Sequence, residues 1–233
     1  MKKPLVVLAA ALLASLAARA QVTSVNAVGM VKTTIPKGEM GLVTIPLISN
    51  DGPQTASELF GDSLPYQTKI FYWDSFEQAY VTITYKQGSF GQPDAWDPDN
   101  KTFDRGEGFF VQIPDNATEE SYDIVFSGEV PGENTASTTD LSVVEGFQLV
   151  GFAYPVSITV SDEDFNIQPS YNDKIYTWGN GGWDITTYKQ GSFGQPDGWD
   201  NPNLALEPGQ GFFYRSETDK TWTVTKENLY TWP

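Results

Sequence analysis

The chain has 233 residues, a formal net charge of −16, and neither cysteine nor histidine. These absences exclude disulfides, the Ser-His-Asp and Cys-His nucleophile systems, and the usual zinc sites. The acidity repels nucleic acid and anionic headgroups, so we expect no nucleic-acid partner. A carboxylate pair remains open, but 30 Asp and Glu residues make such pairs uninformative, and we expect no enzyme.

Residues 1–20 have the pattern of a secretory signal peptide. Lys2 and Lys3 precede an apolar run from Leu5 to Leu16, and Ala18-Arg19-Ala20 resembles a cleavage site. The run is shorter than the roughly 20 residues that a transmembrane helix needs. Cleavage would leave 11 basic and 30 acidic residues, a net charge of −19. We therefore predict a secreted protein, extracellular or on the outer cell surface, with no membrane insertion after cleavage.

Short apolar and β-branched runs then alternate with Gly/Pro turns, as in antiparallel β domains. The predicted strands of residues 21–130 are 25–35, 41–48, 68–73, 80–86, 109–113 and 122–130. Those of the remainder are 141–144, 148–154, 174–178, 183–189, 211–215 and 221–225. Residues 87–104 are expected to form a long loop. The spacing of Thr55 and Glu58 predicts one capped helical turn through Phe60, with 161–164 at the corresponding place in the second half.

One ten-residue sequence, Tyr-Lys-Gln-Gly-Ser-Phe-Gly-Gln-Pro-Asp, occurs twice. It spans 85–94 and 188–197, and similar flanking residues extend the match in both directions. A period near 100 residues suits a duplicated small domain better than a solenoid repeat. We predict an all-β protein with two tandem homologous antiparallel β-sandwich or barrel-like domains. Their bounds are 21–130 and 141–233, joined by a linker at 131–140.

The repeated Gly-x-Gly-Phe-Phe at 106–110 and 209–213 enters a predicted strand. It lacks the third glycine and the following helix of a dinucleotide site. Adjacent phenylalanines indicate a strand that is covered on both faces. We therefore interpret this motif as core.

Two interpretations of the identical loops stay open. In one, Phe90 and Trp96 pack the loop onto its own sheet. In the other, the loops form a ligand surface on which aromatic rings stack against sugars and planar polar groups bond their hydroxyls. The candidate ligand-binding residues are Tyr85, Gln87, Phe90, Gln92, Asp94, Trp96, Tyr188, Gln190, Phe193, Gln195, Asp197 and Trp199.

The same loops are rich in oxygen ligands of the kind that calcium prefers. The candidate metal ligands are Asp94, Asp97, Asp99, Asp197, Asp200 and Asn203. The spacing is not that of an EF-hand, and Asp-Pro-Asp-Asn also suits ordinary turns. We expect that no cofactor is required, and calcium is the metal ion that these loops would suit.

The predicted N-terminal strand has no equivalent in the second half, where the polar linker occupies the corresponding place. It would either close its own sheet or add to the open edge of another molecule, as in donor-strand assembly. The candidate assembly residues are Val25, Ala27, Val28 and Val31.

Residues 25–29 after the leader, Lys174 to Trp178, Gly198 to Asp200 and Pro208 to Phe213 together resemble a group of secreted, internally duplicated β-proteins. These proteins occur in planctomycete- and verrucomicrobia-type bacteria. The resemblance implies export and a β architecture, and it brings no active-site residues with it.

These features favour a secreted structural or interaction protein that self-assembles, through β-strand addition, into a surface layer or fibre. The alternative is a carbohydrate-binding protein that uses the twin aromatic and Asp-rich loops. The expected partners are further copies of the chain, other surface proteins, or glycans.

Overall fold

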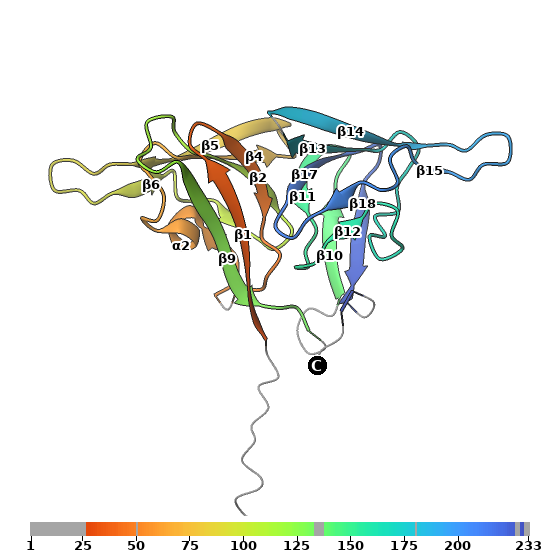
Figure 1. Ribbon diagram of the computed structural model, residues 1–233, viewed down its shortest axis with the longest axis horizontal. Helices are drawn as coiled ribbons and strands as arrows, with labels where there is room; N and C mark the ends of the chain where they lie inside the picture. Colours follow the sequence, from red (N-terminus) through yellow and green to blue (C-terminus); the bar gives the residue numbers. More distant parts are fainter. Residues whose placement is uncertain (1–26, 50, 133–137, 180, 227–228, 231–233) are drawn as a thin grey trace, which may run out of the picture.

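The computed structural model describes residues 27–49, 51–132, 138–179, 181–226 and 229–230. Their regular structure is almost entirely antiparallel β-strand, which confirms the predicted all-β class (Figure 1). The predicted leader and Val25 lie outside the described residues. In the part that the structure describes, no helix is long and apolar enough to cross a membrane.

Two sets of nine strands follow one another within the described residues. The first half (27–132) contains β1 (Val28–Pro36), β2 (Met40–Thr44), β3 (Gln54–Thr55), β4 (Lys69–Asp74), β5 (Ala79–Lys86), β6 (Ala95–Asp97), β7 (Thr102–Phe103), β8 (Gly108–Gln112) and β9 (Ser121–Glu129). The second half (138–230) contains β10 (Thr138–Val143), β11 (Gly146–Gly151), β12 (Ile158–Thr159), β13 (Lys174–Gly179), β14 (Gly182–Lys189), β15 (Gly198–Trp199), β16 (Ala205–Leu206), β17 (Gly211–Ser216) and β18 (Lys220–Thr225).

The strand pairings of the two halves correspond one for one. The first half has a five-stranded sheet of order β2-β8-β4-β5-β6, and the second has β11-β17-β13-β14-β15. The two-stranded ribbon β1-β9 corresponds to β10-β18, and β3-β7 corresponds to β12-β16. Counted from the start of its own half, each strand therefore occupies the same place in the sheets as its counterpart in the other half.

The helix α2 (Ala56–Phe60) forms where the sequence predicts it. The Thr55 hydroxyl accepts from the Glu58 backbone N–H, while the Glu58 carboxylate accepts from the Thr55 N–H at 2.8 Å. Residues 161–164 form turns instead, because the Asp162 carboxylate accepts from the Asp164 N–H two residues later. That local bond competes with a helical turn.

Each half has its own aromatic and aliphatic core. In the first half, Ile70, Ile83 and Phe109 from the five-stranded sheet pack against Ile124 and Phe126 of β9. The second core contains Ile175 and Phe212 of its sheet with Trp222 and Val224 of β18. A two-stranded ribbon thus covers one face of each five-stranded sheet, as in a sandwich.

The opposite faces of the two sheets pack against each other. Leu42, Phe110, Leu149 and Phe213 form the buried centre of this contact. Phe109 and Phe110 point to different clusters, as do Phe212 and Phe213. The prediction that each Phe-Phe strand is covered on both faces is confirmed, and the second covering layer is the other half of the molecule.

Main-chain hydrogen bonds reinforce this contact in a symmetric way. The Thr44 N–H donates to the Gly209 carbonyl, and the Gly151 N–H donates to the Gly106 carbonyl, both at 2.9 Å. Gly106 and Gly209 have φ of +82° and +79°, a region that glycine adopts without penalty. The Gly-x-Gly-Phe-Phe motif therefore joins the halves as well as filling their cores.

The N-terminal strand is not spare. β1 pairs with β9 along its whole length, from Val28 opposite Glu129 to Pro36 opposite Ser121. It also has a counterpart, because β10 occupies the corresponding place beside β18. The strand predicted at 141–144 overlaps β10, but Thr138, Thr139 and Asp140 are polar and were predicted as linker, which hid the correspondence with β1. With β1 already paired, the reason for expecting Val28 and Val31 to act as a donor strand is gone; Ala27 directly precedes β1.

Two further findings concern the connections between strands. The expected loop at 87–104 contains two short strands: β6 adds to the edge of the five-stranded sheet beside β5, and β7 pairs with β3. The strands predicted at 174–178 and 183–189 form an antiparallel hairpin, with Gly179 opposite Gly182. Asn180 at its turn lies outside the described residues.

Candidate functional site: the twin loops

The two identical sequences form the loops 87–94 and 190–197, which we call the first and second loop. Each follows the long outer strand of its five-stranded sheet and ends where a short edge strand begins. Figure 1 shows them as extended loops at opposite ends of the molecule's longest axis, beside β6 and β15. They are the parts of the described chain farthest from the contact between the halves.

The same hydrogen bonds hold both loops. The carboxylate of Asp94 accepts from the Gly88 N–H at 2.8 Å, and that of Asp197 accepts from the Gly191 N–H at 2.8 Å. At each tip a further 3.0 Å bond closes a tight turn, from the Gln92 N–H to the Ser89 carbonyl in the first loop. The equivalent bond in the second loop runs between residues 195 and 192.

Glycine is required at the base of each loop. A Cβ atom on Gly88 would lie 2.0 Å from the Gln92 carbonyl oxygen, and one on Gly191 would lie 1.9 Å from that of Gln195. These oxygens belong to the backbone, so only a rearranged loop would accept a larger residue. The repeated glycines are thus needed for the shape that the two loops share.

Each loop presents a phenylalanine at its tip. Phe90 and Phe193 are fully exposed, and their φ angles are +53° and +51°. A bulky residue with positive φ is an outlier, and this conformation costs about 1–2 kcal/mol. The prediction that Phe90 packs the loop onto its own sheet is therefore wrong. The tip places an apolar ring in water, in a strained backbone, without contributing to the core.

Three of the predicted ligand-binding rings belong to the core. Tyr85, Trp96 and Trp199 are 4%, 3% and 8% exposed. Trp96 stacks on Tyr85 with ring centroids 5.1 Å apart, and its indole N–H donates to the Gly61 carbonyl at 3.0 Å. These rings have no free face for a sugar, so they leave the candidate site. The part of the packing prediction that concerned Trp96 is confirmed.

The remaining predicted ligand-binding residues lie either at the base of a loop or along it. Tyr188 is partly buried against Trp199 at the base of the second loop. The polar side chains along the loops are exposed: Gln87, Gln92, Asp94, Gln190, Gln195 and Asp197.

The candidate calcium ligands do not converge. Asp97 pairs with Lys86, Asp99 accepts from the Ser57 N–H at 3.1 Å, and Asp200 pairs with Lys189 at 3.0 Å. Asp94 and Asp197 hold their own loops, and Asn203 is exposed. Among the described residues, no group of three or more Asp or Glu side chains is arranged to hold a metal ion. The structure uses the clustered carboxylates to shape turns.

A tyrosine that the sequence analysis did not single out lies beside the first loop. The hydroxyl of Tyr66 donates to Asp94, and this bond, with that from the Gly88 N–H, holds the pKa of Asp94 below its ordinary value. The same bond raises the pKa of Tyr66 to about 12, so this hydroxyl stays protonated. The signal was in the repeat, which extends upstream to pair Tyr66 with Tyr171.

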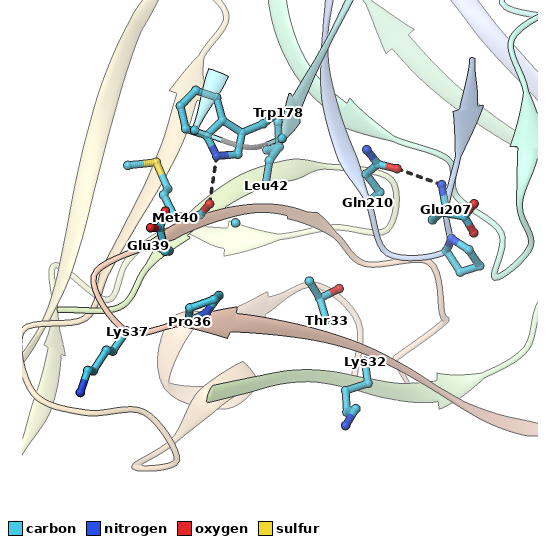
Figure 2. A pocket seen from close by; sticks show the side chains of 14 residues that line it. Lys32, Thr33, Pro36, Lys37, Glu39, Met40, Leu42, Trp178, Glu207 and Gln210 are labelled. Atoms are coloured by element: carbon cyan, nitrogen blue, oxygen red, sulfur yellow. Dashed lines mark hydrogen bonds between the residues drawn. The ribbon is translucent and has the colours of Figure 1, made fainter. Parts of the chain in front are cut away.

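A groove separates the two halves on one side. It has a volume of about 730 Å³ and lies between β1, β2 and the segment 207–210 (Figure 2). At the edge of the groove, the indole N–H of Trp178 donates to the Met40 carbonyl at 2.9 Å. Its lysines, Lys32 and Lys37, are paired with Asp123 and Glu120. Both lysines of the groove are therefore already paired, whereas the glutamines of the two loops are exposed.

Comparison with family models, with curated proteins and with solved structures finds no match.

Proposed function

We propose that this chain is a secreted extracellular structural protein that joins partners through its twin loops. The observation that carries this proposal is the presence of a fully exposed phenylalanine in a strained position at each end of the molecule. Large apolar side chains exposed in this way are a feature of interaction sites, where burial against a partner stabilises the complex. Two identical sites on one chain make it bivalent.

The finer features of the sequence analysis support the same proposal. The one-for-one strand correspondence supports a tandem duplication of one β domain. The leader pattern supports export to the cell surface or beyond. The absence of histidine and cysteine leaves contact as the simplest mode of action.

Further copies of the same chain are the partners we propose first. A monomer with two equivalent sites at opposite ends can extend in both directions, so contacts that do not close into a ring produce a fibre. Since β1 is paired within the molecule, this assembly runs through the loops and not through donation of the N-terminal strand.

Sedimentation velocity and electron microscopy of the chain without its leader test this proposal. We expect regular polymers from the wild type, with and without calcium. Phe90→Ser or Phe193→Ser should limit assembly to small oligomers, and the double variant should be a monomer.

Phe76→Ser is the matched control. Phe76 is 90% exposed on the β4–β5 turn, outside the repeated loops, so its loss removes a similar apolar surface elsewhere. It should leave the polymers unchanged. A wild-type protein that stays monomeric at every concentration, or a double variant that polymerises normally, would show that the loops do not assemble the chain.

A further inference from the structure

A cleft lies beside the first loop, at the base where Asp94 meets Tyr66. It has a volume of about 620 Å³. One side is formed by 62–67 and the loop, and the other by the connection between β8 and β9. Its polar lining includes Asp62, Tyr66, Gln67, Gln87, Asp94 and Asn116.

Tyr66 forms a rigid aromatic surface in this cleft. One face of its ring stacks on Tyr85 at 5.2 Å with an interplanar angle of 20°, and Tyr85 in turn stacks on Trp96. Tyr85 and Trp96 are buried, whereas Tyr66 is 39% exposed. The hydrogen bond to Asp94 fixes the ring from its other end. The outer face of Tyr66 is thus held in place and open to solvent.

Amide side chains surround this ring. Gln67, Gln87 and Asn116 line the cleft, and within the described chain their side chains make no hydrogen bond to protein. An amide both donates and accepts, which matches a hydroxyl group. Asp62 and Asp94 add acceptors, and no basic residue is among the described residues that line the cleft.

We propose that this cleft binds a neutral polysaccharide, with a sugar ring stacked on Tyr66 and its hydroxyls bonded by Gln87 and Asn116. Ring stacking with planar polar partners is the combination that a pyranose offers and requires. The carboxylates and the net charge of −16 disfavour an acidic polymer. This site is separate from the phenylalanine tips and does not depend on assembly.

The second half lacks the wall of the cleft. The connection between β8 and β9 spans eight residues, 113–120, whereas the connection between β17 and β18 spans three, 217–219. Tyr171, the counterpart of Tyr66, is 63% exposed. The described partner of Asp197 is the Gly191 N–H of its own loop. The proposed site therefore belongs to the first half alone.

Affinity electrophoresis in native gels tests the proposal. The probes are hydroxyethylcellulose, xylan, galactomannan and a soluble β-glucan, with polygalacturonate as the acidic comparison. We expect at least one neutral polymer to retard the wild type. Tyr66→Ala should weaken that binding about tenfold or more, as for other central aromatic contacts. Asn116→Ala, which leaves the ring stack intact, should weaken it less.

Tyr171→Ala is the matched control and should bind like the wild type. The Phe90→Ser, Phe193→Ser double variant should also bind normally, so a failure of assembly and a failure of sugar binding are distinguishable. Retardation by none of the neutral polymers, stronger retardation by polygalacturonate, or equal losses in the Tyr66 and Tyr171 variants would overturn the proposal.

Discussion

Trp73 and Trp178 hold the two halves together in the same way from opposite sides. The Trp73 indole N–H donates to the Phe147 carbonyl at 2.8 Å, and that of Trp178 donates to the Met40 carbonyl at 2.9 Å. The two acceptors stand at equivalent places at the beginning of β11 and β2. The contact thus resembles a twofold dimer interface built within one chain.

We expect Trp73→Ala and Trp178→Ala each to destabilise the whole chain. Loss of a half-buried indole from a packed contact removes about 2–4 kcal/mol from the free energy of unfolding. Trp73→Phe keeps a ring and removes the hydrogen bond, for about 1 kcal/mol. Urea unfolding followed by circular dichroism measures both. A Trp73→Ala variant as stable as the wild type would mean that this contact contributes little.

Glycines control how closely the halves approach. A Cβ atom on Gly108 would lie 2.8 Å from the Val150 carbonyl oxygen, and one on Gly211 would lie 2.8 Å from that of Val43. We expect Gly108→Ala and Gly211→Ala each to cost roughly 1–3 kcal/mol, as other overpacked sites do. Gly198→Ala is the control, since nothing lies within 4 Å of its Cβ position. The midpoints of thermal unfolding should separate the three variants.

Much of the fold follows from local sequence. The capping box at Thr55 is set by neighbouring residues and forms as predicted, and the strands predicted at 174–178 and 183–189 pair with each other. The paired phenylalanines correctly indicated a doubly covered strand. What covers the second face was not predictable, because it depends on distant residues of the other half: Phe110 packs with Leu149 and Phe213. The first half of β10 was predicted as linker, because its pairing with β18 outweighs the polar character of Thr138 to Asp140.

The candidate site was predictable only in part. The exact repetition drew attention to the loops, but residue type alone did not separate Phe90 from Trp96. One ring is exposed at the tip and the other is buried at the edge strand, a difference set by the loop shape that Gly88 permits. The clustered aspartates suggested calcium because their partners could not be foreseen: Asp94 and Asp197 accept from backbone N–H groups of their own loops, and Asp99 accepts from Ser57.

A buried ion pair in the second half should make stability depend on pH. Burial alone would raise the pKa of Asp173, but bonds from Lys220, Tyr214 and two backbone N–H groups outweigh it and hold the pKa below its ordinary value. This contribution to stability is therefore present above the unfolded-state pKa of about 3.9 and is lost as the pH falls through the lower folded-state pKa.

We expect Asp173→Asn to lose roughly 3 kcal/mol at neutral pH, because it leaves Lys220 buried without its partner charge. Its stability should then change less than that of the wild type in acid. Urea midpoints measured from neutral pH down to about pH 2 compare the two over this titration range. Asp184→Asn, an exposed change in β14, is the control. Parallel losses of stability in acid by wild type and Asp173→Asn would contradict this account.

The rate of proteolysis at each loop should measure how well that loop is ordered. Asp197 closes the second loop by accepting from the Gly191 N–H, so Asp197→Ala should loosen that loop and speed chymotrypsin cleavage after Phe193. Cleavage after Phe90 in the same molecule is the internal control and should keep its rate. Mass spectrometry of timed digests distinguishes the two cuts. Equal rates at Phe193 in variant and wild type would mean that this bond does not order the loop.

The opposite directions of the two loops decide what bivalence can achieve. The halves are packed into one body, so neither loop can swing round to the side of the other (Figure 1). Each loop can therefore engage a partner that lies beyond its own end of the molecule, without competition from the other loop (Figure 1). The same arrangement favours bridging across a gap, with a spacing between the bridged objects set by the length of the protein.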